Sequence, residues 1–181
     1  MKRGNNYIIY KDKQIAMIGK SGSSAIAKAI YQHIGHVITS AESNLESNSP
    51  GWQNVVPQTQ NPDRPMIPVR DPIERFRSAC AQEDRTAAQE ISRLERGRQS
   101  YHTKRTSSYL VEGARLYKFP EHIKEIARDL DLLGIERVND SNSNNSPKPI
   151  LTDDEIKRVE ELYADDISLY NSIENAGQIY C

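Results

Sequence analysis

The chain has 181 residues, a length that fits one folded domain, so we expect a single domain over residues 1–181. Lys and Arg number 24 and Asp and Glu number 25, which gives a formal net charge of -1 at pH 7. General nucleic-acid binders usually carry a basic excess, so this balance argues against a nucleic-acid partner.

Short apolar runs at the start of the chain predict strands, and the first helical pattern follows a loop rich in Gly and Ser. Each run is bounded by polar or Gly residues, as is usual for strand ends. Apolar residues then recur at helical spacing. The expected elements are strands at 7–10 and 15–18 with a turn at 11–13, a loop at 19–24, a helix at 25–34 and a strand at 36–39.

A long polar loop, residues 40–64, precedes a second strand-to-helix unit. A short apolar segment after this loop predicts a strand that ends at Arg70. The sequence Asp-Pro-Ile-Glu over residues 71–74 then marks a helix start. Asp is a preferred N-cap, Pro suits the first helical position, and Glu completes a capping box. We expect this helix to continue to about Arg96.

The second half of the chain continues the alternation of strands and helices. A low-complexity stretch of Asn and Ser reads as a loop between two of these elements. Thr152 and Glu155 form another capping box. The expected elements are a loop at 98–108, a strand at 116–119, a helix at 120–132, a loop at 139–149 and a helix from 152 to about 170.

This alternation predicts an α/β fold, with a parallel sheet flanked by helices. In such sheets, ligands bind at the carboxyl ends of the strands, beside helix N-termini. Two segments of this chain have that context. One is the loop around Lys20, and the other is the turn at Arg70.

The loop around Lys20 has the composition of an anion site. Glycine lets backbone N–H groups approach a phosphate, and the start of a helix adds a partial positive charge. The loop is not a Walker A motif, because Gln14 stands where that motif needs a Gly. An ordinary Gly/Ser turn is the alternative. The candidate binding residues are Lys20, Ser21, Gly22, Ser23 and Ser24.

The turn at Arg70 is the second candidate anion site. Arg70 closes the predicted strand, and Ser78 lies two turns into the following helix. These two side chains are placed to bind one phosphate, with Arg forming a charge-assisted fork and Ser adding a donor. The alternative is a surface pair between Arg70 and Glu74, four positions apart. Arg75 and Arg77 are expected to be solvated helix residues or members of helix-surface pairs.

Both segments resemble motifs of one enzyme family. Residues 69–78, Val-Arg-Asp-Pro-Ile-Glu-Arg-Phe-Arg-Ser, closely resemble the 3′-phosphate-binding motif V-R-D-P-x-E-R-x-x-S of sulfotransferases that use 3′-phosphoadenosine 5′-phosphosulfate (PAPS). Residues 20–24, Lys-Ser-Gly-Ser-Ser, resemble the 5′-phosphosulfate loop K-x-G-[ST]-[ST] of the same family. The two motifs also occur in the family's order. Residues 102–110 and 151–170 resemble later segments of carbohydrate-type members.

The resemblance, which extends from about Ile15 to Tyr170, implies a P-loop-like sulfotransferase fold in a short soluble form. It implies transfer of a sulfuryl group from PAPS to an acceptor hydroxyl, with a saccharide favoured, and release of 3′,5′-adenosine bisphosphate (PAP). Lys20 would contact the bridging oxygen, and Gly22 to Ser24 would supply donors at the 5′ side. Arg70 and Ser78 would hold the 3′-phosphate. No metal is implied.

An acceptor hydroxyl needs a general base. Carbohydrate-type members use a Glu or a His after the Lys loop, so the resemblance makes Glu42 the first choice. It lies closest after the predicted strand at 36–39. Glu46, His36 and His102 are alternatives. Glu42 as a solvated loop carboxylate and His102 as a surface loop residue are the readings without a catalytic role.

Two departures from the family pattern keep other functions open. The Pro-Gln pair expected near Lys104 and Arg105 is absent, and only 50 positions separate Lys20 from Arg70. A catalytically degenerate protein that only binds PAPS or PAP is one alternative. A P-loop-type nucleotide kinase is another, and an interaction domain without a nucleotide is a third.

The cysteines and the apolar segments bear on the compartment. Cys80 and Cys181 form no CxxC pair, so neither a zinc site nor a redox motif is expected, and the usage fits a reducing compartment. The basic, polar start is followed by no apolar leader, and no stretch approaches the length of a membrane span. We therefore expect a cytoplasmic protein without a membrane partner.

Overall fold

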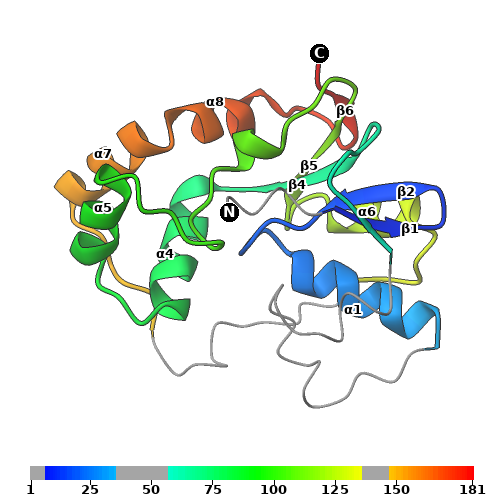
Figure 1. Ribbon diagram of the computed structural model, residues 1–181, viewed down its shortest axis with the longest axis horizontal. Helices are drawn as coiled ribbons and strands as arrows, with labels where there is room; N and C mark the ends of the chain where they lie inside the picture. The colour runs from blue at the N-terminus through cyan, green and yellow to red at the C-terminus, as the bar shows by residue number, and fades with distance from the viewer. Residues whose placement is uncertain (1–6, 36–56, 136–146) are drawn as a thin grey trace.

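The computed structural model describes residues 7–35, 57–135 and 147–181. Over these residues the chain forms a six-stranded mixed sheet with helices on both faces (Figure 1). The strands are β1 (Tyr7–Tyr10), β2 (Lys13–Ala16), β3 (Gln58–Thr59), β4 (Met66–Arg70), β5 (Arg115–Phe119) and β6 (Gln178–Ile179). The helices are α1 (Ser23–His33), α4 (Pro72–Gln82), α5 (Ala87–Glu95), the short 3-10 helix η1 (Thr106–Tyr109), α6 (Ile123–Asp129), α7 (Asp153–Leu162) and α8 (Ala164–Ser172).

The α/β class is confirmed, but the sheet is mixed rather than purely parallel. The strand order is β3-β1-β2-β4-β5-β6, and only the central strands β2, β4 and β5 are parallel to one another. Strands β1 and β2 are antiparallel because the turn at Lys11 and Asp12 is too short for a crossover connection. The edge strands β3 and β6 are also antiparallel to their neighbours, and the sequence did not predict them.

Apolar side chains from α1 and α6 cover one face of the sheet, where Ile26, Ile30 and Ile126 are fully buried. The other face packs against η1 and α8 through Tyr109 and Leu169. A third cluster joins helices α4, α5 and α7 beside the sheet (Figure 1). The central strands are therefore enclosed, and their carboxyl ends meet at one edge of the sheet.

The long helix predicted from Asp71 to about Arg96 is wrong, because the chain forms two helices there. Helix α4 ends at Gln82, and Asp84 has a left-handed backbone conformation with φ 50. Thr86 then starts α5 with a reciprocal capping box to Gln89. A Thr three residues before a Gln is a local start signal that the apolar periodicity of the segment concealed.

Other boundaries differ in the same way. The C-terminal helix is divided at Tyr163 into α7 and α8, and the capping box of Thr152 with Glu155 is confirmed. Asp71 caps α4 as predicted by accepting a hydrogen bond from the Glu74 amide at 2.8 Å.

The predicted strand at 36–39 lies outside the described residues. No helix in the described segments has both the length and the apolar character that crossing a membrane requires.

Candidate functional site

The two candidate motifs meet at the carboxyl edge of the parallel strands. Strands β2 and β4 are parallel neighbours, so the loop after β2 and the end of β4 lie at the same edge. There the guanidinium of Arg70 donates a hydrogen bond to the backbone oxygen of Lys20 at 3.0 Å. The Arg70 side chain is 22% exposed, so it is ordered by the protein yet open to a ligand.

Glu74, the alternative partner of Arg70, is held by other cations. It lies 4.0 Å from the Arg70 guanidinium, but 2.5 Å from Arg77 and 3.3 Å from Lys148. Partial burial acts to raise the pKa of Glu74, yet the hydrogen bonds from Lys148 and Arg77 leave that pKa below its ordinary value. The geometry therefore favours the contact of Arg70 with the Lys20 loop over a simple surface pair.

Helix α1 starts as an anion site requires. Lys20 and Gly22 both have positive φ, 61 and 85, so the backbone turns sharply just before the helix. The N-cap is Gly22, no side chain caps the helix, and its first turn contains no acidic residue. By contrast, every other α-helix in the described residues has an acidic residue in its first turn. The partial positive charge at the start of α1 is therefore not offset locally.

Lys20 reaches across the edge of the sheet to α4. Its ammonium donates a hydrogen bond to the Gln82 amide oxygen at 2.7 Å, so the side chain is placed by the end of the helix that starts after Arg70. Gln82 is a site residue that the sequence did not predict. Gln at the C-terminus of a helix is common, and nothing in the local pattern indicates a partner 62 positions away.

Comparisons of the chain with models of known protein families, with curated proteins and with solved structures found no match. The resemblance to sulfotransferases therefore rests on the motif residues of the sequence alone.

The segment that contains His102 lies over the Lys20 loop. A Cβ atom at Gly19 would lie 2.7 Å from the Tyr101 carbonyl oxygen and 2.9 Å from the His102 Cα atom, so only Gly permits this approach. The Tyr101 hydroxyl also donates to the backbone oxygen of Met17 at 2.9 Å. His102 is thus the predicted base that the described residues bring next to the Lys20 loop.

The predicted serines differ in their exposure. Ser21 is fully buried, and its amide donates to the Ile18 oxygen at 3.2 Å, so in this structure it shapes the loop. Ser23 and Ser78 are also buried, while Ser24 is half-buried at the start of α1. The backbone amides of the first turn of α1 are therefore the main donors that this loop presents.

Three other predicted candidates for the base, Glu42, Glu46 and His36, lie outside the described residues. Within the described segments, no group of three or more His, Cys, Asp or Glu residues has the arrangement of a metal site. Burial raises the pKa of the Cys80 thiol to about 12, so this cysteine is a packed core residue and not a nucleophile.

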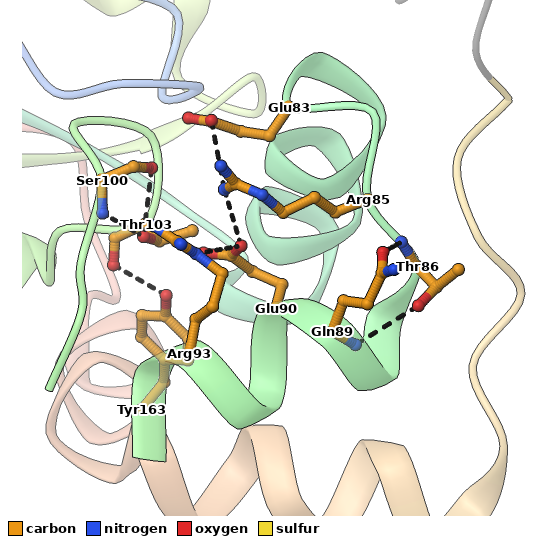
Figure 2. Close-up of polar contacts among 9 residues, drawn as sticks. All are labelled: Glu83, Arg85, Thr86, Gln89, Glu90, Arg93, Ser100, Thr103 and Tyr163. Carbon is orange, nitrogen blue, oxygen red and sulfur yellow. Dashed lines mark hydrogen bonds and ion pairs between the residues drawn. The ribbon is translucent and has the colours of Figure 1, made fainter. Parts of the chain in front are cut away.

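A hollow of about 660 Å³ lies along α5, away from the predicted residues, and its lining includes Arg85 and Arg93. Glu90 beneath it is fully buried and pairs with Arg85 at 2.9 Å and with Arg93 at 3.4 Å (Figure 2). These guanidiniums are thus already matched by an internal carboxylate. The hollow contains none of the sequence-predicted site residues.

The expectation that Arg75 is a solvated helix residue is wrong. Its side chain is 1% exposed and pairs with Asp166, which is 0% exposed, at 3.0 Å. The available sequence signal was the position of both residues inside segments that resemble the family, 69–78 and 151–170. Burial itself could not be predicted, because the partners lie 91 positions apart.

The Gly22→Ala variant is expected to be markedly destabilised. An added Cβ would clash with the Phe119 ring, and the residue would keep a left-handed conformation. The conformation costs about 1–2 kcal/mol, and overpacking against the ring adds about 1–3 kcal/mol. Urea unfolding measures the loss. Gly97→Ala is the matched control, because Gly97 also has positive φ, 71, but nothing lies within 4 Å of its Cβ position. Equal losses in the two variants would contradict close packing of Phe119 on the loop.

Proposed function

We propose that this protein is a PAPS-dependent sulfotransferase that moves a sulfuryl group to an acceptor hydroxyl, with a saccharide as the favoured acceptor class. The observation that carries the proposal is the 3.0 Å hydrogen bond from Arg70 to the Lys20 backbone. It joins the two motif segments, 50 positions apart in the chain, at the edge where α/β sheets bind ligands. A donor with phosphates at both its 3′ and 5′ positions matches two adjacent cationic sites.

The reaction needs alignment and charge stabilisation more than it needs covalent chemistry by the protein. The acceptor oxygen forms a bond to sulfur as the bond from sulfur to the bridging phosphate oxygen breaks, and PAP leaves. Lys20 and the first amides of α1 would stabilise the charge that develops on the leaving phosphate. Arg70, at the end of β4, would hold the 3′-phosphate together with Ser78, which lies about two turns into the helix α4 that follows.

The proton of the acceptor hydroxyl must pass to a base. His102 is proposed for this role because its backbone lies directly against Gly19, next to Lys20. Glu42 stays a prediction from the sequence, since it lies outside the described residues. The two assignments are separated by the His102→Asn and Glu42→Gln variants. The residue whose replacement abolishes turnover while nucleotide binding is retained is the base.

The experiment that tests the nucleotide class is a calorimetric titration with PAP, run beside AMP and ATP in the absence of metal. Clear preference for PAP supports the proposal, and acceptors are then screened with labelled PAPS. Binding of PAP without transfer to any acceptor would favour the catalytically degenerate binder. Tighter binding of ATP with magnesium would contradict the proposal and favour a kinase.

The Arg70→Ala variant is expected to bind PAP about 10- to 100-fold more weakly, because a hydrogen bond to a charged group contributes about 1.5–3 kcal/mol. AMP lacks the 3′-phosphate, so its affinity should change little. Calorimetry with both nucleotides measures the difference. Arg158→Ala is the control, since Arg158 is an exposed arginine of α7 that pairs with Glu95 of α5. Equal losses for PAP and AMP would remove Arg70 from the 3′-phosphate role.

A further inference from the structure

Residues 100–107, the His102 loop, are tied to three separate parts of the fold. One tie is the buried pair of Arg75 and Asp166. The Asp166 carboxylate accepts hydrogen bonds from the Thr106 and Ser107 amides at 2.8 and 2.9 Å. Arg75 binds that carboxylate at 3.0 Å and also donates to the Lys104 carbonyl at 2.6 Å. Helix α4, which starts after Arg70, therefore also holds the His102 loop.

A second tie comes from Tyr163, at the junction of α7 and α8. Its hydroxyl donates to the Thr103 carbonyl at 2.7 Å, and its ring packs on the Arg75 guanidinium. Thr103 is 1% exposed, and its hydroxyl accepts a hydrogen bond from the Ser100 amide at 2.9 Å. Figure 2 shows Tyr163 pointing at Thr103 while Ser100 lies on the other side of that residue. The residue after His102 is thus fixed.

The third tie fixes the residue before His102. The Tyr101 hydroxyl donates to the Met17 carbonyl at 2.9 Å, just after β2, and its ring lies edge-on to the His102 ring at 5.4 Å. Both neighbours of His102 are therefore anchored, one to the sheet edge that leads into the Lys20 loop and one to the C-terminal helices. An anchored backbone on both sides limits where the imidazole can lie.

We propose that Tyr101, Tyr163 and the Arg75–Asp166 pair are positioning residues that hold His102 against the Lys20 loop during transfer. The inference rests on the proposed function and adds to it the set of contacts that places the base. It predicts that small errors in the loop affect turnover, since a displacement of about 1 Å can cost about 100-fold in rate. The alternative to a positioning role is that these contacts only stabilise the fold.

The test uses two variants that remove one hydroxyl each and keep the ring, Tyr101→Phe and Tyr163→Phe. Each is expected to lower kcat about 10-fold, and the double variant more, through misplacement of the base. The affinity for PAP and the KM for PAPS should stay within about 2-fold, because neither ring lies in the nucleotide motifs. Tyr117→Phe is the matched control, since it removes a hydroxyl on β5 that donates a hydrogen bond to Asp129 of α6 at 2.7 Å.

The spectroscopic readout is the imidazole signal of His102 in protein labelled with ¹⁵N at its four histidines. Tyr101→Phe should shift or broaden that signal, whereas Tyr117→Phe should not. Unchanged kcat in Tyr101→Phe and Tyr163→Phe, or full turnover in His102→Asn, would overturn the inference. Failure of the wild-type chain to bind PAP would instead overturn the proposed function, so the two failures are distinguishable.

Discussion

The Lys20→Ala variant is expected to lose about 10²–10³-fold in the rate of sulfuryl transfer, because it removes the cation that the proposed function assigns to the leaving phosphate. The fold should stay intact. Lys20 is only half-buried, and its ammonium donates a hydrogen bond to Gln82 at 2.7 Å. Single-turnover measurements with labelled PAPS report the chemical step, and urea unfolding reports the stability.

Two controls make the Lys20 result interpretable. Lys157→Ala removes an exposed lysine from α7, far from the motif segments in the chain, and should leave transfer unchanged. Gln82→Ala should lower the rate less than Lys20→Ala, because it keeps the charge and loses only the group that places it. Full activity in Lys20→Ala would contradict the role given to the loop, whatever nucleotide the protein binds.

The Asp166→Ala variant is expected to lose about 3–5 kcal/mol in the free energy of unfolding, the usual cost of removing one partner of a buried ion pair. Asp166 is 0% exposed and accepts three hydrogen bonds, one of them from the buried Arg75. Its removal would leave that guanidinium charged and largely unmatched. Urea unfolding followed by circular dichroism measures the loss.

Asp165→Ala is the control for Asp166, because the neighbouring carboxylate is 74% exposed and pairs with Arg105 only at 3.8 Å. An exposed pair of this kind is worth about 0–1 kcal/mol, so little change is expected. The Arg75→Met/Asp166→Leu double variant should recover only part of the stability. It removes the unmatched charge, but it leaves the Thr106 and Ser107 amides without their carboxylate acceptor. A small loss in Asp166→Ala would contradict the buried pair.

The sequence alone determined the features that depend on near neighbours in the chain. The N-caps at Asp71 and Thr152 and the apolar spacing of α1 are such features, and they are confirmed. So is the α/β class, which follows from the alternation of elements. The caps and the apolar spacing depend on hydrogen bonds or side-chain contacts within about four residues, where local chemistry determines the outcome. The motifs around Lys20 and Arg70 were likewise visible before the fold.

Tertiary structure decided the rest, because its contacts join residues that have no local relation. Burial of Arg75 depends on Asp166, 91 positions later, and placement of Lys20 depends on Gln82, 62 positions later. The sequence assigned Arg75 to solvent since an isolated helix would leave a guanidinium there. The approach of His102 to Gly19 likewise requires the folded loop. A charged side chain is buried only where the fold supplies its partner, and no local pattern contains that information.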